Sequence, residues 1–327
     1  MLQKPSLNSK ASINSKYLRE RLILWDLGDF KKLMSEAREI QKRVKKELDK
    51  KQSNTQKLFC RYMMLGKIAQ ATRLLDKESN SLVVHELTDE IFDVLLSKHP
   101  DGEEIDPSIT SKYPSECPAV EPVIFEQIDE AAIYTAAKNT NGSAGPTHVD
   151  ADGWQHILCS KYYGKKSANL STAIANVAKR MCAEEIEAVS LEELLSCRLI
   201  PLKKKDEPKG VRPIGIGEVI RCIIGKAVMT VLKPDIMQAC GSIQTCSGID
   251  SGIEAAVHAM ADKFNEKETE AMILVDASNA FNLMSRRAAL LAVQHHCPPF
   301  YRYLLNTYQV PTSQYISGAK GKLILSK

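Results

Sequence analysis

The chain of 327 residues, with 44% hydrophobic and 26% charged residues, has the composition of a globular protein and room for one large or two ordinary domains. The sequence shows no apolar leader and no run long enough to span a membrane, and its nine cysteines are scattered, so we expect a reduced intracellular protein, nuclear or cytosolic. The net charge of +4 conceals a basic segment, residues 1–57 with 15 Lys and Arg against 7 Asp and Glu, and an acidic one, residues 81–130 with 2 against 13.

The first 98 residues predict a helical, basic N-terminal region. Residues 1–17 are rich in Ser, Asn and Lys, which predicts a loose arm, and a helical pattern from about 17 to 51 carries its lysines mainly in its second half. We interpret this charge as a solvated helix face, with contact to a nucleic-acid backbone as the alternative. Asn54 is expected to open a further helix that continues through Tyr62 and Ile68 to Leu75, and Thr88 is expected to open another.

Residues 99–123 hold five of the chain's fourteen prolines and many acids, which predicts a Pro-rich acidic linker before a second region, 124–327. The pattern beyond the linker is again helical as far as residue 195. Asp150 is the expected N-cap of one of these helices.

The pattern changes near residue 198, where two short apolar segments flank a strong turn. Residues 199–202 and 211–214 predict a β-hairpin, because the segment between them contains Asp-Glu-Pro-Lys-Gly. Three consecutive lysines and Arg212 would gather positive charge at the hairpin tip, where phosphate oxygens can bind. A long helix is expected next, ending at Pro234.

The apolar run Met272-Ile-Leu-Val ends in Asp276, and it predicts a buried central strand with that carboxylate at its carboxyl end. Ser278 or Asn279 is expected to cap a helix that contains Ala288, Leu290, Leu291 and Val293. An aromatic ring, Phe281, lies five positions after Asp276. A lone aspartate at a strand end is common. A more specific feature than this aspartate alone is the order of the segments around it: basic hairpin, long helix, glycine-rich loop, strand and Asp-x-x-x-x-Phe.

Segments in this order resemble reverse transcriptases, most closely those of non-LTR retrotransposons. The segments are Leu199-Ile-Pro-Leu-Lys-Lys-Lys, Gly210-Val-Arg-Pro-Ile-Gly-Ile-Gly-Glu, Gln244-x-x-x-Gly248 and Ile273-Leu-Val-Asp-Ala-Ser-Asn-Ala-Phe. Upstream, Leu95-Leu-Ser-Lys-His-Pro, Gly142-Ser-Ala-Gly-Pro and Asp150-Ala-Asp-Gly-Trp resemble the approach to the fingers of such enzymes. The resemblance spans about residues 55–327. It implies an α+β fold, in which a mostly helical N-terminal region precedes the fingers and a partial, truncated palm of a right-hand polymerase.

The resemblance also implies the residues of a nucleotide site. Asp276 matches the first catalytic aspartate, whose carboxylate, together with the carbonyl oxygen of Ala277, would ligate two Mg²⁺ ions. Phe281 matches the ring beneath the incoming sugar, which excludes a 2′-hydroxyl and so favours deoxynucleotides. Its alternative role is that of a core residue.

Residues of the hairpin, and of the loop after the long helix, match residues that contact nucleotide, template or primer in reverse transcriptases. Lys204, with Lys203 or Lys205 as alternatives, matches a residue that holds the triphosphate. Arg212 matches the arginine that stacks on the base and contacts the phosphates. Gln244 matches a loop residue near template and primer, and a turn-stabilising amide is its alternative.

The implied reaction is nucleotidyl transfer from dNTPs to the 3′-hydroxyl of a DNA primer on an RNA template by two-metal catalysis. The family's other carboxylates belong to a Tyr-x-Asp-Asp hairpin after a Gln-Gly-Asp-Pro-like loop, and the 327 residues contain neither motif. We therefore expect a reverse-transcriptase fragment that is catalytically incomplete as written and binds Mg²⁺ weakly or not at all. The alternatives are a non-catalytic nucleic-acid-binding or scaffold protein derived from a retroelement, and another palm polymerase, against which Phe281 argues.

Overall fold

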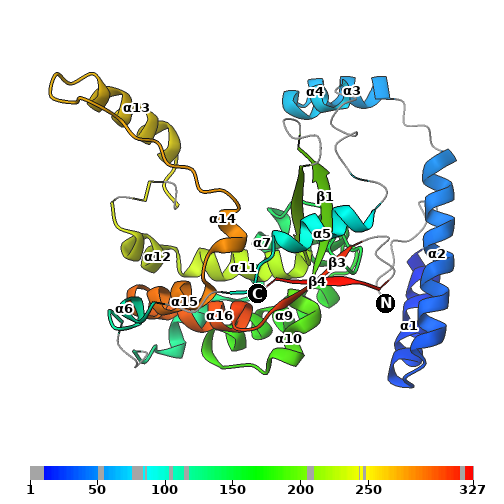
Figure 1. Cartoon of the computed structure of the whole chain (residues 1–327). Helices are drawn as coiled ribbons and strands as arrows, with labels where there is room; N and C mark the ends of the chain where they lie inside the picture. The colour runs from blue at the N-terminus through cyan, green and yellow to red at the C-terminus, as the bar shows by residue number, and fades with distance from the viewer. Residues whose placement is uncertain are drawn as a thin grey trace. The chain divides into compact units, whose positions relative to one another are not determined.

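The computed structural model gives the chain a mixed α+β fold, mostly helical with one small sheet, which confirms the predicted class (Figure 1). The structure describes residues 11–50, 55–75, 84, 87–102, 106–113, 118–204, 210–242, 244–245, 248–316 and 321–326. The chain forms two compact units: the first comprises residues 1–85, 147–149 and 201–212, and the second comprises the rest. The division into residues 1–98, 99–123 and 124–327 stays a prediction.

The first unit consists mainly of helices. They are α1 (Ala11–Asp26), α2 (Phe30–Lys50), α3 (Thr55–Met64) and α4 (Ile68–Leu75). Gly28 (φ +70°) turns the chain between α1 and α2, and Gly66 (φ +66°) does so between α3 and α4, because glycine adopts left-handed backbone angles without steric cost. The predicted loose arm up to residue 17 is therefore wrong from Ala11 onward. The single helix predicted from about 17 to 51 is two helices.

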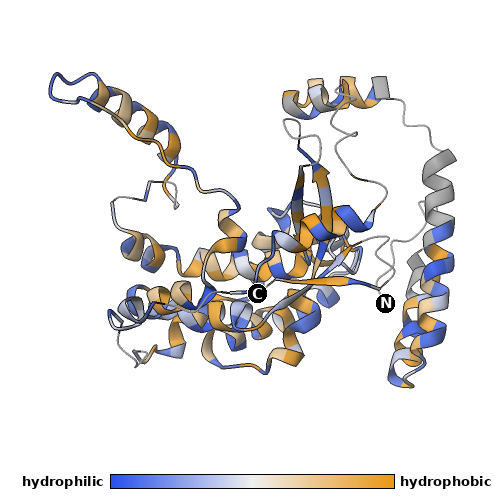
Figure 2. Ribbon diagram, viewed as in Figure 1, coloured by the Kyte–Doolittle hydropathy of each residue, from blue (hydrophilic) through white to orange (hydrophobic). Residues whose placement is uncertain are grey.

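The second unit holds the larger helical core. Its helices are α5 (Asp89–Ser97), α6 (Pro107–Thr110), η2 (Pro122–Gln127, a 3₁₀-helix), α7 (Glu130–Lys138), α8 (Ala151–Cys159), α9 (Lys165–Ala183), α10 (Ala188–Leu195), α11 (Val219–Val231), α12 (Lys233–Cys240), α13 (Gly252–Phe264), α14 (Ala280–Leu283), α15 (Arg286–His296) and α16 (Pro298–Tyr308). Helices α7, α9 and α11 pack against one another and bury Ile133, Ala178 and Val228 completely. Hydrophobic residues at helical spacing on each helix form this core, and Figure 2 shows the apolar character of α11.

Several helix ends follow from local side chains. Thr88 caps α5 by accepting a hydrogen bond from the Ile91 amide (3.3 Å), and Asp150 caps α8 by accepting one from the Gly153 amide (2.9 Å), which confirms both predicted caps. Pro234 lies in the first turn of α12, where a missing amide hydrogen costs nothing. It therefore opens that helix as well as following the end of α11.

The sheet has the strand order β2-β1-β3-β4. Its strands are β1 (Cys197–Lys203), β2 (Val211–Gly217), β3 (Thr312–Ile316) and β4 (Leu323–Ser326). The predicted hairpin of β1 and β2 is confirmed, and the Lys204 amide donates to the carbonyl oxygen of Gly210 (2.8 Å) near its turn. Strand β1 runs parallel to β3, with Leu199 opposite Ile316, and β3 runs antiparallel to β4. The turn residues 205–209, Lys205 among them, lie outside the described part of the chain.

Candidate functional site

The segment that leads to Asp276 is extended and exposed rather than a buried strand. Ile273, Leu274 and Val275 are 84%, 83% and 89% exposed, and the segment joins none of the four strands of the sheet. An apolar segment becomes a strand only where neighbouring strands accept its backbone hydrogen bonds, and no described strand lies beside this one. The prediction of a buried central strand is therefore wrong for the described structure.

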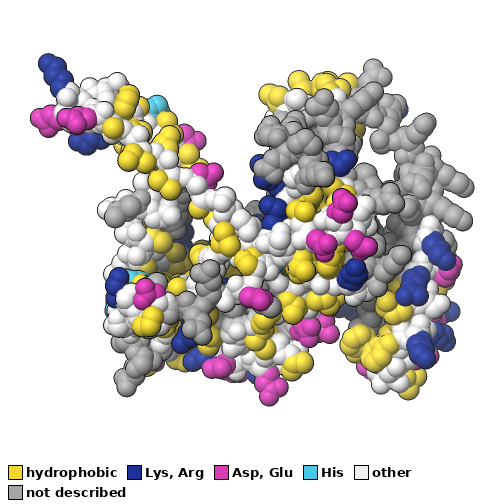
Figure 3. Space-filling view, in the orientation of Figure 1, with side chains coloured by type: hydrophobic (Ala, Val, Ile, Leu, Met, Phe, Trp, Pro, Cys, Tyr) yellow, Lys and Arg dark blue, Asp and Glu magenta, His cyan; other side chains and the backbone are white. Residues whose placement is uncertain are grey.

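The apolar side chains of this part of the chain remain largely uncovered. Helix α13, which precedes the segment, exposes hydrophobic residues along its length, including Ile253 (63%), Val257 (62%) and Phe264 (55%). Figure 3 shows them as a run of yellow side chains. Phe281 in α14 is 96% exposed, so its predicted alternative role as a core residue is wrong. The ring is accessible to a ligand.

The side chain of Asn279, predicted as a candidate helix cap, instead anchors the turn between Asp276 and Phe281. Asn279 adopts left-handed backbone angles (φ 53°), and its Nδ2 donates to the carbonyl oxygen of Lys98 at the end of α5 (2.9 Å). The Asn282 Nδ2 in turn donates to the Asn279 Oδ1 (2.9 Å). Asparagine tolerates these angles better than most residues, which is the signal the sequence offered. The helix predicted to contain Ala288 and Val293 is α15, and its cap is Ser285 rather than Ser278 or Asn279. Asn279 is the N-cap position of the short helix α14 and makes no side-chain cap hydrogen bond there.

A second contact joins two of the segments that carry the family resemblance. Gly145, in the stretch Gly142-Ser-Ala-Gly-Pro, lies so close to the end of β2 that a Cβ atom on it would be 2.7 Å from the carbonyl oxygen of Gly217 and 2.9 Å from the amide nitrogen of Glu218. Only glycine permits this approach of two backbones. The contact holds the loop at residues 142–146 against the junction between β2 and α11.

The residues predicted to contact nucleotide and template fall in both units. Lys204 and Arg212 lie on the hairpin in the first unit, with Arg212 exposed on β2 and Lys204 half-buried directly after β1. Gln244, Asp276, Ala277 and Phe281 belong to the second unit, where Gln244 is exposed in the loop between α12 and α13. The structure places Lys204 and Arg212 on one hairpin. It places Asp276 and Ala277 in one loop and Phe281 in the short helix α14 that follows this loop. Their joint site stays a prediction.

Asp276 and Ala277 supply oxygen atoms, the ligand type that Mg²⁺ prefers, and both residues are exposed. Magnesium demands six ligands in near-octahedral geometry. The described residues contain no group of three His, Cys, Asp or Glu side chains that could hold a metal ion. We derive no catalytic step from a metal ion at these residues.

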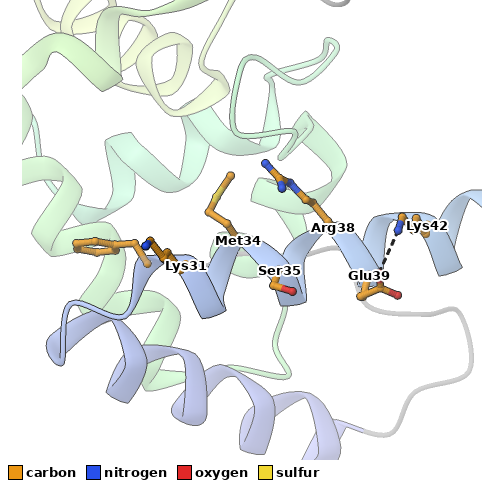
Figure 4. A pocket seen from close by; sticks show the side chains of 7 residues that line it. Lys31, Met34, Ser35, Arg38, Glu39 and Lys42 are labelled. Carbon is orange, nitrogen blue, oxygen red and sulfur yellow. Dashed lines mark hydrogen bonds and ion pairs between the residues drawn. The ribbon is translucent and has the colours of Figure 1, made fainter. Parts of the chain in front are cut away.

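A shallow groove on the first unit combines positive charge with apolar surface (Figure 4). Its lining comes from one face of α2 and consists of Phe30, Lys31, Met34, Ser35, Arg38, Glu39 and Lys42. Glu39 binds Lys42 (3.1 Å), whereas no ion pair within the described residues includes Lys31 or Arg38. Such a face suits contact with phosphates, the alternative role predicted for this helix.

Comparison with family models and with curated proteins gives no match for this chain. Among the described residues, every helix falls short of the length and hydrophobicity needed to cross a membrane.

Proposed function

We propose that residues 124–327 are the fingers and part of the palm of an RNA-directed DNA polymerase of the non-LTR retrotransposon type. The observation that carries the proposal is the pairing of motif segments that lie far apart in the sequence. Gly145 packs on Gly217, and Asn279 bonds to Lys98, 181 positions away. All four residues lie within segments that resemble this family, so the contacts between these segments support the proposed relationship to reverse transcriptases.

In this proposal, Lys204 and Arg212 hold the triphosphate and the base of an incoming dNTP, with Arg212 supplying a planar set of donors. Phe281 lies under the sugar, a role for which its exposure leaves room. Gln244 lies near the template and primer. Asp276 and Ala277 supply the first oxygen ligands for two Mg²⁺ ions. The remaining carboxylates are absent from the 327 residues, so this polypeptide binds template and primer without extending the primer.

The proposal predicts that the double variant Lys204→Ala/Arg212→Ala binds an RNA–DNA hybrid about tenfold more weakly than the wild type, because the two cations that hold the dNTP at the primer end also attract the backbone phosphates of the hybrid. Fluorescence anisotropy of a labelled hybrid measures the change. The matched control is Lys161→Ala/Lys166→Ala, which removes two exposed positive charges elsewhere. Equal weakening in both variants would show that only overall charge matters and would contradict the proposed site.

The second candidate is a non-catalytic nucleic-acid-binding or scaffold protein, and the basic groove on α2 favours it. The triple variant Lys31→Ala/Arg38→Ala/Lys42→Ala separates the two candidates in the same binding measurement. If this variant loses hybrid binding while Lys204→Ala/Arg212→Ala retains it, α2 is the binding surface and the scaffold function is favoured.

A further inference from the structure

Two arginines from different helices approach the same aromatic ring in the second unit. The guanidinium carbon of Arg221 in α11 lies 5.8 Å from the centre of the Tyr308 ring, and that of Arg286 in α15 lies 5.6 Å from it. Both distances are typical of cation–π contacts. Tyr308 ends α16 and remains 39% exposed, so solvent and small solutes reach this cluster of three side chains.

Neutral groups, rather than acids, fix the orientation of both guanidinium groups. Arg286 donates from Nη1 to the carbonyl oxygen of Val310 (3.0 Å) and from Nη2 to the Ser326 hydroxyl (2.7 Å). Arg221 donates from Nη1 to the carbonyl oxygen of Leu195 (3.4 Å). The ion pairs within the described part of the chain include neither arginine. Each guanidinium carries five donors, more than these hydrogen bonds use.

The two arginines lie at helix positions where the helix dipoles disfavour positive charge. Arg286 is the first residue of α15 and Arg221 the third of α11, and the positive end of a helix dipole disfavours a cation in the first turn. Burial lowers the pKa of the Arg286 guanidinium. The positive charge of Arg221 acts in the same direction, whereas Tyr308 and Cys197 act in the opposite one. Two like charges are thus held near each other at the positive ends of two helices.

We propose that Arg221 and Arg286, arranged around Tyr308, form a phosphate-binding site. A phosphate group placed between the two guanidiniums would accept their free donors and remove the repulsion between them. The same chemistry recognises a backbone phosphate of a nucleic acid and a phosphate of a free nucleotide. The site uses none of the residues assigned to the nucleotide and metal contacts above, and it does not depend on the proposed polymerase function.

The test titrates the full chain with inorganic phosphate at constant ionic strength, followed by calorimetry. We expect saturable binding of one phosphate with a dissociation constant on the order of millimolar, and binding about tenfold weaker in Arg221→Gln. Arg221→Lys keeps the charge but loses the planar set of donors, so it should weaken binding by a few fold. Lys226→Gln, which removes one positive charge from the same helix, is the matched control and should bind like the wild type.

Absence of saturable phosphate binding to the wild type would overturn the proposal, and so would equal binding by wild type and Arg221→Gln. Equal weakening in Lys226→Gln would overturn it as well, because the effect would then come from overall charge. If circular dichroism shows that Arg221→Gln does not fold, the phosphate affinity of Arg221→Lys is the test, and binding equal to that of the wild type would overturn the proposal. The same titration with dTTP and with a short oligonucleotide identifies the source of the phosphate. Unchanged phosphate binding in Lys204→Ala/Arg212→Ala would separate this site from the proposed nucleotide contacts.

Discussion

Raising the NaCl concentration from 50 to 200 mM is expected to weaken binding of an RNA–DNA hybrid to this chain by about two orders of magnitude. The affinity of a protein for duplex nucleic acid falls with salt in proportion to the number of phosphates it neutralises, and about four such contacts give a change of this size for a fourfold rise in salt. Cations on the hairpin, including Lys204 and Arg212, supply part of that number.

The measurement is the slope of log affinity against log salt concentration from anisotropy titrations. In the double variant Lys204→Ala/Arg212→Ala the slope should be shallower by about 2, because about two phosphate contacts are lost. Binding that does not change with salt would remove electrostatic contact with the backbone as the basis of the interaction.

Gly145→Val is expected to lower the free energy of unfolding of the second unit by about 3 kcal/mol, since a side chain at this position has no space. Its Cβ would lie 2.7 Å from the carbonyl oxygen of Gly217, and the obstructing atoms are backbone atoms that cannot rotate away. Gly217 leads directly into α11. A larger side chain at position 145 would therefore push the loop at residues 142–146 away from the start of this core helix.

Urea unfolding followed by circular dichroism measures this loss. Gly102→Val is the matched control, because no heavy atom lies within 4 Å of a Cβ placed on Gly102. A shift of the unfolding midpoint in Gly145→Val no larger than that in the control would show that the close contact with β2 is dispensable.

Features set by neighbouring residues were predictable from the sequence. The caps at Thr88 and Asp150 and the hairpin of β1 and β2 depend on a few adjacent side chains, and the structure has all of them. The breaks at Gly28 and Gly66 were missed because an isolated glycine is compatible with a helical pattern and ends a helix only in some contexts.

Features that need a distant partner were not predictable in the same way. The apolar run before Asp276 has the composition of a buried strand, but a strand exists only beside another, and the described sheet offers none to this segment. The contact between Asn279 and Lys98 and the convergence of Arg221 and Arg286 on Tyr308 depend on packing between elements far apart in the chain. Periodicity and composition carry no information about such contacts.

The most direct test of the proposed function is a single electrophoretic assay with a labelled DNA primer annealed to an RNA template, dNTPs and Mg²⁺. Native gels report binding of the hybrid, and denaturing gels of the same reaction report extension of the primer. For the 327-residue chain, retention of the hybrid without a longer primer is the predicted result. Failure to retain the hybrid would contradict the polymerase origin. Extension that disappears in Asp276→Asn would contradict the conclusion that this chain lacks a complete catalytic site.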